Sequence, residues 1–140
     1  MNNYTIEQRK IRVFEYQALR KTTGWSNLED EAVKVALEND LFSVCIFDQE
    51  QIIGIGRVIG DGAIYYYIQD VIVHPNYQNK GIGKIIMESI ETYLFQFAKN
   101  NAFIGLMAAE GVKEFYKKFG YQERAPEKPG MYKIASNCTK

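Results

Sequence analysis

The sequence predicts a single α/β domain over residues 1–140, in which four helices flank a mixed, mostly antiparallel β-sheet. Three observations support this expectation. Apolar residues recur at helical spacing before residue 40, β-branched and aromatic runs follow up to residue 73, and helical and extended patterns alternate after residue 80. A chain of 140 residues has the usual size of one domain and can bury a core without disulfides.

Two helices are expected first. One apolar stripe at positions i, i+3, i+7 and i+8 consists of Ile11, Phe14, Ala18 and Leu19. A second stripe with helical spacing consists of Leu28, Ala32, Val35 and Ala36, and Ser26 or Asn27 is the expected N-cap of that helix. The sequence leaves undecided whether residues 4–6 form a short strand.

The next segments are predicted to be strands. Residues 42–47 and 52–59 are rich in β-branched and aromatic side chains and are separated by a polar stretch, which is typical of a hairpin. Residues 60–62, Gly-Asp-Gly, supply the next turn. A long strand of aromatic and branched residues is expected over residues 63–73.

The second half of the chain alternates between helix and strand. A third helix is expected from about residue 84 to 96, with its apolar face formed by Ile82, Ile86, Ile90, Tyr93 and Phe97. A strand is expected over residues 103–107. A fourth helix carries Val112, Phe115, Tyr116 and Phe119 and ends at Gly120. A loop and a final strand over residues 131–135 complete the expected order.

A glycine-containing loop between the long strand and the third helix is a candidate anion site. Gly81 and Gly83 lack a Cβ, so the backbone there can adopt positive φ and a ligand can approach the main-chain N–H groups. These groups begin a helix, where they lack intrahelical partners and the dipole is positive, which suits a diphosphate. Ile85 and Ile86 exclude the P-loop and the dinucleotide-binding pattern, respectively.

The pattern that fits is Gln78-x-x-Gly81-x-Gly83 after a strand that ends in Val-His-Pro. A second segment, residues 114–121, has the sequence Glu-Phe-Tyr-Lys-Lys-Phe-Gly-Tyr. With these two motifs in this order, the sequence resembles the GNAT superfamily of acetyl-CoA-dependent N-acetyltransferases. The resemblance covers roughly residues 40–125.

This resemblance implies the GNAT fold with splayed central strands. The strands over residues 64–73 and 103–107 would diverge at a bulge and receive the pantetheine arm of acetyl-CoA, which would pair with main-chain groups of Val71 and Val73. The residues that the resemblance assigns to acetyl-CoA are Val71, Ile72, Val73, Gln78, Asn79, Lys80, Gly81, Ile82, Gly83 and Lys84. No metal site is expected.

The second motif places Tyr116 at the family's general-acid position. A phenol with an ordinary pKa near ~10 can protonate a departing CoA thiolate. No base is assigned, because Tyr67 and Gln69 occupy the positions where the family often has a carboxylate or histidine. Strand alternation turns the adjacent Asp70 to the opposite face unless a bulge intervenes, and a water chain is an alternative. Ala109 also departs from the family, in which an asparagine at this position often helps to bind the cofactor.

Six residues are candidates for the acceptor side: Trp25, Arg57, Tyr65, Tyr67, Gln69 and Asp70. Trp25, the only tryptophan, is expected in the loop between the first two helices, where it could wall a pocket or close the core. Arg57 and Asp61 could form a simple salt bridge across the turn, and Tyr65 and Tyr67 share a sheet face. If these residues line a site, it is compact and aromatic, and it suits a small amine better than a long peptide.

Composition limits the partners. The 17 basic and 17 acidic residues cancel, so no overall field favours nucleic acid or an anionic membrane. Two cysteines, Cys45 and Cys138, and one histidine argue against a disulfide framework or a zinc site. The polar N-terminus and the lack of a long apolar run lead us to expect a cytoplasmic protein. A homodimer is left open.

Three functions fit these observations. The first is transfer of acetyl from acetyl-CoA to the primary amine of a small molecule by direct attack in a ternary complex, since no cysteine in the motif could carry the acetyl group. The second is acetylation of a protein lysine or N-terminus. The third is a CoA-binding module without turnover, which the missing base and Ala109 would explain.

Overall fold

The structure is a computed structural model that describes residues 3–136. The chain forms two compact units, Met1–Met107 and Ala108–Lys140.

The first unit is built on a five-stranded sheet with the strand order β1-β2-β3-β4-β5. Its strands are β1 (Tyr4–Glu7), β2 (Phe42–Asp48), β3 (Gln51–Gly60), β4 (Tyr65–Val73) and β5 (Phe103–Gly105). Strands β1 to β4 pair antiparallel with their neighbours, whereas β5 runs parallel to β4. The predicted mixed, mostly antiparallel sheet is confirmed, and β1 is the strand that the sequence left open.

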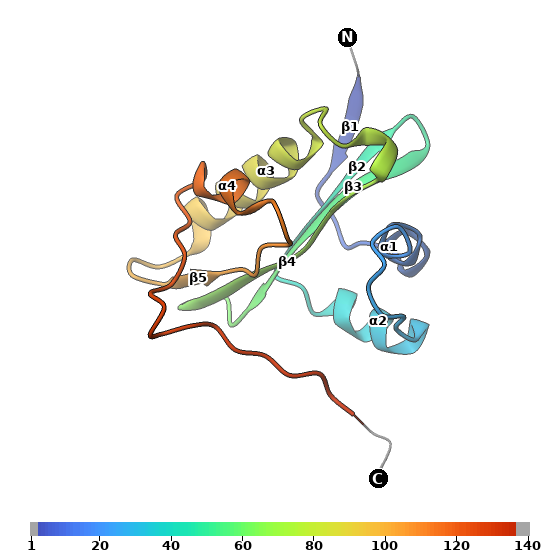
Figure 1. Ribbon diagram of the computed structural model, residues 1–140. Coiled ribbons are helices and arrows are strands. Elements are labelled where there is room, and N and C mark those ends of the chain that lie inside the picture. Colours follow the sequence, from blue (N-terminus) through green and yellow to red (C-terminus); the bar gives the residue numbers. More distant parts are fainter. Residues whose placement is uncertain (1–2, 137–140) are drawn as a thin grey trace. The chain divides into compact units, whose positions relative to one another are not determined.

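Helices cover both faces of this sheet (Figure 1). Helices α1 (Val13–Arg20) and α2 (Asp30–Glu38) lie on one face, and α3 (Ile82–Phe97) lies on the other. The core under α1 and α2 contains Ile11, Tyr16, Leu19, Val33, Leu37, Cys45, Ile55 and Ile72. The buried residues of α3 are Ile82, Ile86, Met87, Ile90 and Leu94, close to the predicted apolar face.

The predicted apolar stripe of α2 is wrong in phase, and that of α1 is confirmed only at Ile11 and Leu19. Phe14 and Val35 are exposed, while the buried residues of the two helices are Glu15, Tyr16, Leu19, Val33 and Leu37. Glu15 can face inward because its carboxylate accepts hydrogen bonds from Nη1 and Nη2 of Arg9 at 3.0 and 2.9 Å. A buried ion pair thus sets the face of α1, and a search for apolar periodicity does not detect it.

Three element ends also differ from the prediction. The N-cap of α2 is Glu29 rather than residue 26 or 27, and it makes no side-chain capping hydrogen bond. Strand β4 begins at Tyr65, because Oδ1 of Asp61 accepts hydrogen bonds from the N–H groups of Ala63, Ile64 and Tyr65 and holds them in the turn. Strand β5 ends at Gly105, before residue 107.

A bulge in β4 exchanges the two faces of that strand. The Tyr66 ring lies 6.4 Å from the Tyr93 ring of α3, whereas Ile72 packs in the core under α1 and α2. Strict alternation would place positions 66 and 72 on the same face. The exchange occurs at Asp70, which has a left-handed backbone with φ of 54°, where the ladder between β3 and β4 changes register.

Strands β4 and β5 pair only over a short stretch. Tyr65, Tyr66 and Tyr67 lie opposite Phe103, Ile104 and Gly105. Within residues 3–136, no strand pairs with this edge of β4 after Tyr67. This edge of β4 therefore has no strand partner beyond Tyr67 among the described residues, in line with the predicted divergence of the two strands.

The second unit contains α4 (Lys113–Lys117), and Gly120 follows it with φ of 94°. The strand expected over residues 131–135 is not formed, and Met131, Tyr132 and Ile134 are exposed. An apolar run forms a stable strand only beside a partner strand, which this segment lacks among the described residues. Cys138 lies outside the described residues.

Candidate active site

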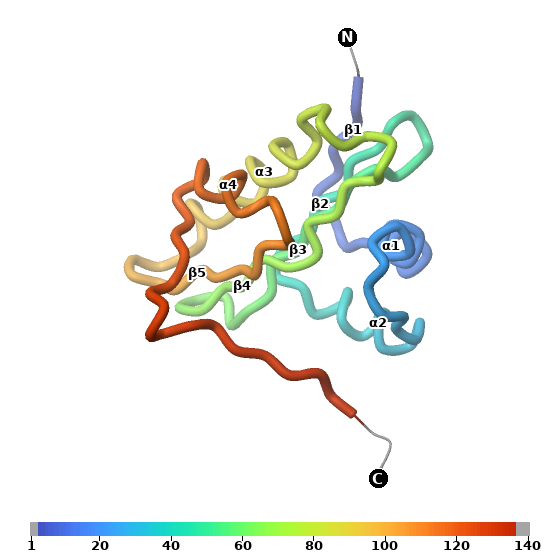
Figure 2. Tube along the Cα trace, in the orientation of Figure 1, coloured from blue at the N-terminus to red at the C-terminus, as the bar shows by residue number. Residues whose placement is uncertain are grey.

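The connection from β4 to α3 presents main-chain groups at a helix start (Figure 2). A short 3-10 helix, η1 (Pro75–Tyr77), leads into residues 78–81. Gly81 is the N-cap of α3 and has φ of 84°, and Asn79 has φ of 64°. The expectation of positive φ at Gly83 is wrong, because this residue lies inside α3. Its missing side chain instead leaves the first turn of the helix uncovered.

This helix start fits a diphosphate. A Cβ built on Gly81 would meet no atom within 4 Å, so open space adjoins the backbone there. The first turn of α3 contains no acidic residue that would repel an anion. Its leading N–H groups have no intrahelical acceptor and lie at the positive end of the helix dipole. The N–H groups of Ile82, Gly83 and Lys84 follow the N-cap Gly81 at this helix start, where the sequence predicts an anion site.

Polar side chains near this loop either tie it to β4 or add positive charge beside the helix start. Gln78 Nε2 donates to the main-chain oxygen of Val73 at 3.3 Å and ties the loop to the end of β4. Lys80 Nζ lies 5.6 Å from the centre of the Tyr77 ring, a cation–π distance. Lys84 is largely exposed, and its Nζ makes only a loose contact with a Glu88 oxygen, at 4.0 Å. The positive charge of Lys84 is therefore available to an anion.

The unpaired edge of β4 leads to this loop. Val71, Ile72 and Val73 follow the bulge and precede the 3-10 helix. The Ile72 side chain is buried in the core, so this residue can offer a ligand only its main chain. The open edge and the helix start thus follow one another along the chain, in the order that the pantetheine arm and the diphosphate of CoA require.

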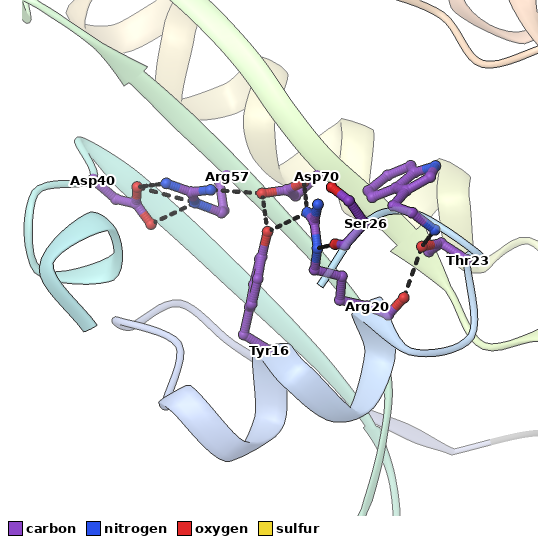
Figure 3. A network of polar contacts seen from close by, with 8 residues as sticks. Tyr16, Arg20, Thr23, Ser26, Asp40, Arg57 and Asp70 are labelled. Carbon is purple, nitrogen blue, oxygen red and sulfur yellow. Dashed lines mark hydrogen bonds and ion pairs between the residues drawn. The ribbon is translucent and has the colours of Figure 1, made fainter. Parts of the chain in front are cut away.

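A buried network of charges lies beside the bulge (Figure 3). Arg57 of β3 donates to both carboxylate oxygens of Asp40, with its shortest hydrogen bond at 2.8 Å from Nη2. Its Nη1 donates to Asp70 Oδ2 at 2.5 Å. The same Asp70 oxygen accepts a hydrogen bond from the Tyr16 hydroxyl at 2.8 Å. The salt bridge expected between Arg57 and Asp61 is not formed.

The bulge puts Asp70 on the face that carries Arg57, and this resolves the alternative left open by the sequence. The Asp70 carboxylate is 3% exposed and is held by Arg57, Tyr16 and, at 3.9 Å, Arg20. These three partners occupy the carboxylate and hold it beside the bulge. Asp70 is therefore better placed to fix the bulge than to act as a base.

Burial and charge affect the other groups of the network. Burial alone would lower the pKa of Arg57, but its hydrogen bonds to Asp40 and Asp70 raise it above its usual value. Burial, reinforced by the charge of Asp70, raises the pKa of Tyr16 to about 12. Arg57 thus stays charged and Tyr16 stays protonated, so the network holds its charge pattern across the physiological range.

Arg20 and the loop that follows α1 complete this side of the sheet. The Arg20 guanidinium lies 5.4 Å from the Trp25 ring and donates from Nε to the main-chain oxygen of Ser26 at 2.9 Å. The Trp25 side chain neither plugs the core nor lies free, since the residue is 42% exposed and stacked on Arg20. Arg20, Tyr16 and Asp40 were not predicted as site residues, and only the pairing needs of the buried Arg57 and Asp70 could have indicated them.

The tyrosines of β4 line the point where β4 and β5 part. Tyr65 is exposed and its ring lies 6.1 Å from that of Phe103. A Cβ at Gly105 would lie 2.7 Å from the Phe103 ring, so the glycine leaves room for this ring, and it would make an ordinary contact with the Tyr67 ring at 3.4 Å. Burial raises the pKa of Tyr67, which keeps its hydroxyl protonated. Gln69 lies opposite Arg57 in the ladder between β3 and β4.

Tyr116 lies in α4 of the second unit. Its ring makes edge contacts with those of Phe115 and Tyr121, at 5.1 and 6.5 Å between centroids. Burial raises the pKa of Tyr116. Its phenol therefore stays protonated above neutral pH, as a general acid requires.

Comparison with known proteins identifies the family. Residues 38–123, more than half of the chain, match the family described as "Acetyltransferase (GNAT) domain". The chain belongs to the GNAT acetyltransferases. The match crosses the boundary between the two units at residue 107. GNAT enzymes use acetyl-CoA as the acetyl donor, which is consistent with the helix start and open strand edge described above.

Three relatives illustrate the similarity. The structure of a probable acetyltransferase from methicillin-resistant Staphylococcus aureus is 33% identical, with a TM-score of 0.89, and the alignment covers 95% of this chain and all of that one. An uncharacterised N-acetyltransferase, ycf52, of Pyropia yezoensis is 27% identical over 92% of this chain and 75% of its own length. A histone acetyltransferase of Glycine max is 29% identical over 87% of this chain, but only 57% of that protein is covered.

Among residues 3–136, no helix is long and apolar enough to cross a membrane. The same part of the acetyltransferase contains no group of three or more His, Cys, Asp or Glu residues that could hold a metal ion.

Proposed function

We propose that this acetyltransferase moves the acetyl group of acetyl-CoA to the primary amine of a small molecule, by direct attack in a ternary complex. The observation that carries the proposal is the character of the surface beside the bulge. Trp25 offers an aromatic face, Tyr67 and Gln69 are neutral, and Arg57 binds both Asp40 and Asp70. These two carboxylates are not free to hold a cationic peptide side chain, and the aromatic face suits a compact amine.

The proposed reaction needs one proton acceptor and one proton donor. The neutral amine nitrogen attacks the thioester carbonyl, a C–N bond forms, and the C–S bond breaks as the tetrahedral intermediate collapses. The ammonium proton passes to water, and Tyr116 gives its proton to the departing thiolate of CoA. N–H groups of the helix start and the β4 edge bind the donor, so its thioester is held while the amine approaches.

Protein acetylation is a second candidate, because one relative is named a histone acetyltransferase. A CoA-binding module without turnover is a third candidate, since the described residues supply no carboxylate free to act as a base near Tyr67 and Gln69. We favour the small amine because Trp25 and Tyr67 offer aromatic surface and because Arg57 binds the carboxylates of Asp40 and Asp70.

An assay of CoA thiol release distinguishes the three. The full chain is given acetyl-CoA and a panel of small monoamines, polyamines and lysine peptides, with Gly81→Val as the control that should lose donor binding. We expect release with at least one small amine. A peptide with higher kcat/KM than every small amine would favour protein acetylation. Tight acetyl-CoA binding without any release would favour the binding module.

We also propose a location, a range of partners and an assembly state for the protein. A cytoplasmic location agrees with the free, buried thiol of Cys45, since reducing compartments keep thiols unpaired. We also propose that the protein has no nucleic-acid partner, in line with its balanced charge. A homodimer is the assembly to look for by light scattering.

A further inference from the structure

Arg20 joins two parts of the molecule that are separate in sequence. It is the last residue of α1, and its side chain is 14% exposed. On one side its Nε donates to Ser26 and its guanidinium stacks on Trp25. On the other side its Nη1 donates to the Tyr16 hydroxyl at 3.0 Å and lies 3.9 Å from Oδ1 of Asp70 (Figure 3).

Polar contacts hold the loop over residues 22–28, and apolar burial contributes little. Trp25 and Leu28 are 42% and 44% exposed. The Trp25 N–H donates to Thr23 Oγ1 at 3.0 Å, and Thr23 Oγ1 donates to the Arg20 oxygen at 2.7 Å. A loop with few buried apolar contacts has a low local stability. Gln17 holds the far end of the loop through the Leu28 oxygen, and the Arg20 side chain holds its middle through Ser26 and Trp25.

The strand side of this connection lies at the start of the open edge. Asp70 has its left-handed backbone at the bulge, and Val71 follows as the first residue of the segment proposed to pair with pantetheine. Tyr16 and Arg57 bind Oδ2 of Asp70, and its Oδ1 faces Arg20, so the residue that precedes Val71 is in direct contact with the Arg20 side chain. The Arg20 side chain thus connects strand β4 to the loop over residues 22–28.

We propose that Arg20 is a positioning residue that couples the binding of acetyl-CoA to the order of the loop over residues 22–28. The inference deepens the proposed function and rests on it in one respect, since it places the amine acceptor at the Trp25 loop. Binding of the donor holds the Val71 main chain beside the bulge and, through Asp70 and Arg20, holds Trp25 in place for the acceptor. By linkage, a bound acceptor then tightens donor binding by the same factor.

Trp25 reports this coupling directly, because it is the only tryptophan of the chain. The experiment measures quenching of its fluorescence by acrylamide with and without acetyl-CoA, and measures the Kd of acetyl-CoA by calorimetry. In the wild-type protein, acetyl-CoA should protect Trp25 from acrylamide. In Arg20→Met, Trp25 should be quenched equally with and without acetyl-CoA, while the Kd for acetyl-CoA alone changes less than about threefold.

Two variants test whether the protection of Trp25 requires the arginine at position 20 or only a positive charge in this region. Lys21→Met removes a positive charge from the next, exposed residue and should keep the protection. Arg20→Lys keeps the charge but cannot donate to Ser26 and Tyr16 while stacking on Trp25, so the protection should stay lost. Full protection in Arg20→Met, or full rescue by lysine, would overturn the proposal.

A kinetic test uses the best amine of the panel. Arg20→Met should raise KM for the amine about tenfold and leave kcat nearly unchanged, because the loop binds the acceptor and does not touch the reacting atoms. A parallel fall of kcat and of thermal stability, with unchanged KM, would make Arg20 a structural residue only. If Arg20→Met does not fold, Thr23→Val loosens the same loop and should raise the same KM. The quenching test needs no amine, so it can succeed even if the proposed acceptor class is wrong.

Discussion

Arg57 and Asp40 form a bidentate pair, in which Nη2 lies 2.8 Å from Oδ1 and Nε lies 3.1 Å from Oδ2. The pair links β3 to the segment that follows α2 and leaves the Nη1 atom of Arg57 for Asp70 in β4. One arginine thereby satisfies two carboxylates that are almost inaccessible to water. The position of the bulge depends on this arrangement, since Asp70 is its left-handed residue.

Arg57→Met should destabilise the protein by about 3–5 kcal/mol, because it leaves two buried carboxylates without their main partner. Urea unfolding at neutral pH measures the change. The double variant Arg57→Met with Asp40→Asn should lose less free energy of unfolding than the two single variants lose together. The second substitution removes one of the buried charges that Arg57→Met leaves uncompensated. A loss below about 1 kcal/mol for Arg57→Met would show that the network contributes little to stability.

Gly81→Val should abolish acetyl-CoA binding. A β-branched side chain at φ of 84° is strained and would occupy the open space beside the helix start. In the wild-type protein, acetyl-CoA at a hundredfold excess over its Kd should stabilise the fold by about 2.7 kcal/mol. Thermal unfolding with and without ligand measures this.

The matched control for this variant is Gly62→Val. Gly62 has φ of 79° and lies in the turn before β4, where a Cβ would make only an ordinary contact with Leu41 at 3.6 Å. The Gly62→Val variant should lose a similar amount of stability and should still be fully stabilised by acetyl-CoA. Equal responses from Gly81→Val and Gly62→Val would contradict the role of the helix start.

The sequence predicted those features that local signals specify. The hairpin, the glycine-containing loop and α3 follow from turn residues and from apolar spacing over short stretches, and they are confirmed. The face of Asp70 was not predictable, because one residue in a left-handed conformation reverses the alternation of β4 and no pattern marks it. The side of α1 was missed because Glu15 is buried with Arg9. Arg20 was missed because its polar contacts with Tyr16, Ser26 and the distant Asp70 follow no apolar pattern.

Glu15 should make stability fall at acid pH. Burial alone would raise the pKa of Glu15, but hydrogen bonds from the Arg9 side chain and the Arg12 N–H lower it below its ordinary value. A carboxyl whose pKa is lower in the folded state stabilises the protein above the unfolded pKa of about 4.3, and the contribution is lost as pH falls through the folded pKa. Urea unfolding between neutral and acid pH should show this decline.

Glu15→Gln removes the titrating group and tests the assignment. The variant should be less stable at neutral pH by about 1.5–3 kcal/mol, the usual worth of hydrogen bonds to a charged group. Its stability should also fall less steeply between pH 5 and the acid limit than that of the wild-type protein, by linkage at about these pH values. Parallel curves for the two proteins would assign the acid sensitivity to other carboxyl groups.

Tyr116→Phe tests the proposed acid and separates an enzyme from a binding module. The change keeps the ring contacts with Phe115 and Tyr121 and deletes only the hydroxyl, so folding and acetyl-CoA affinity should change little. The rate should fall by about 10²–10⁴, the usual contribution of a general acid. Tyr132→Phe, an exposed tyrosine of the same unit, should keep the wild-type rate.

The pH profile gives the second half of this test. The amine must lose its proton to attack, so wild-type kcat/KM should rise through neutral pH. The phenol must keep its proton, and burial raises the pKa of Tyr116, so the decline should begin only above the ordinary tyrosine value of about 10. In Tyr116→Phe the rise should persist and this decline should vanish, because the group that titrates there is gone. An unchanged kcat would remove Tyr116 from catalysis, whereas a weakened acetyl-CoA affinity with normal kcat would make it a binding residue.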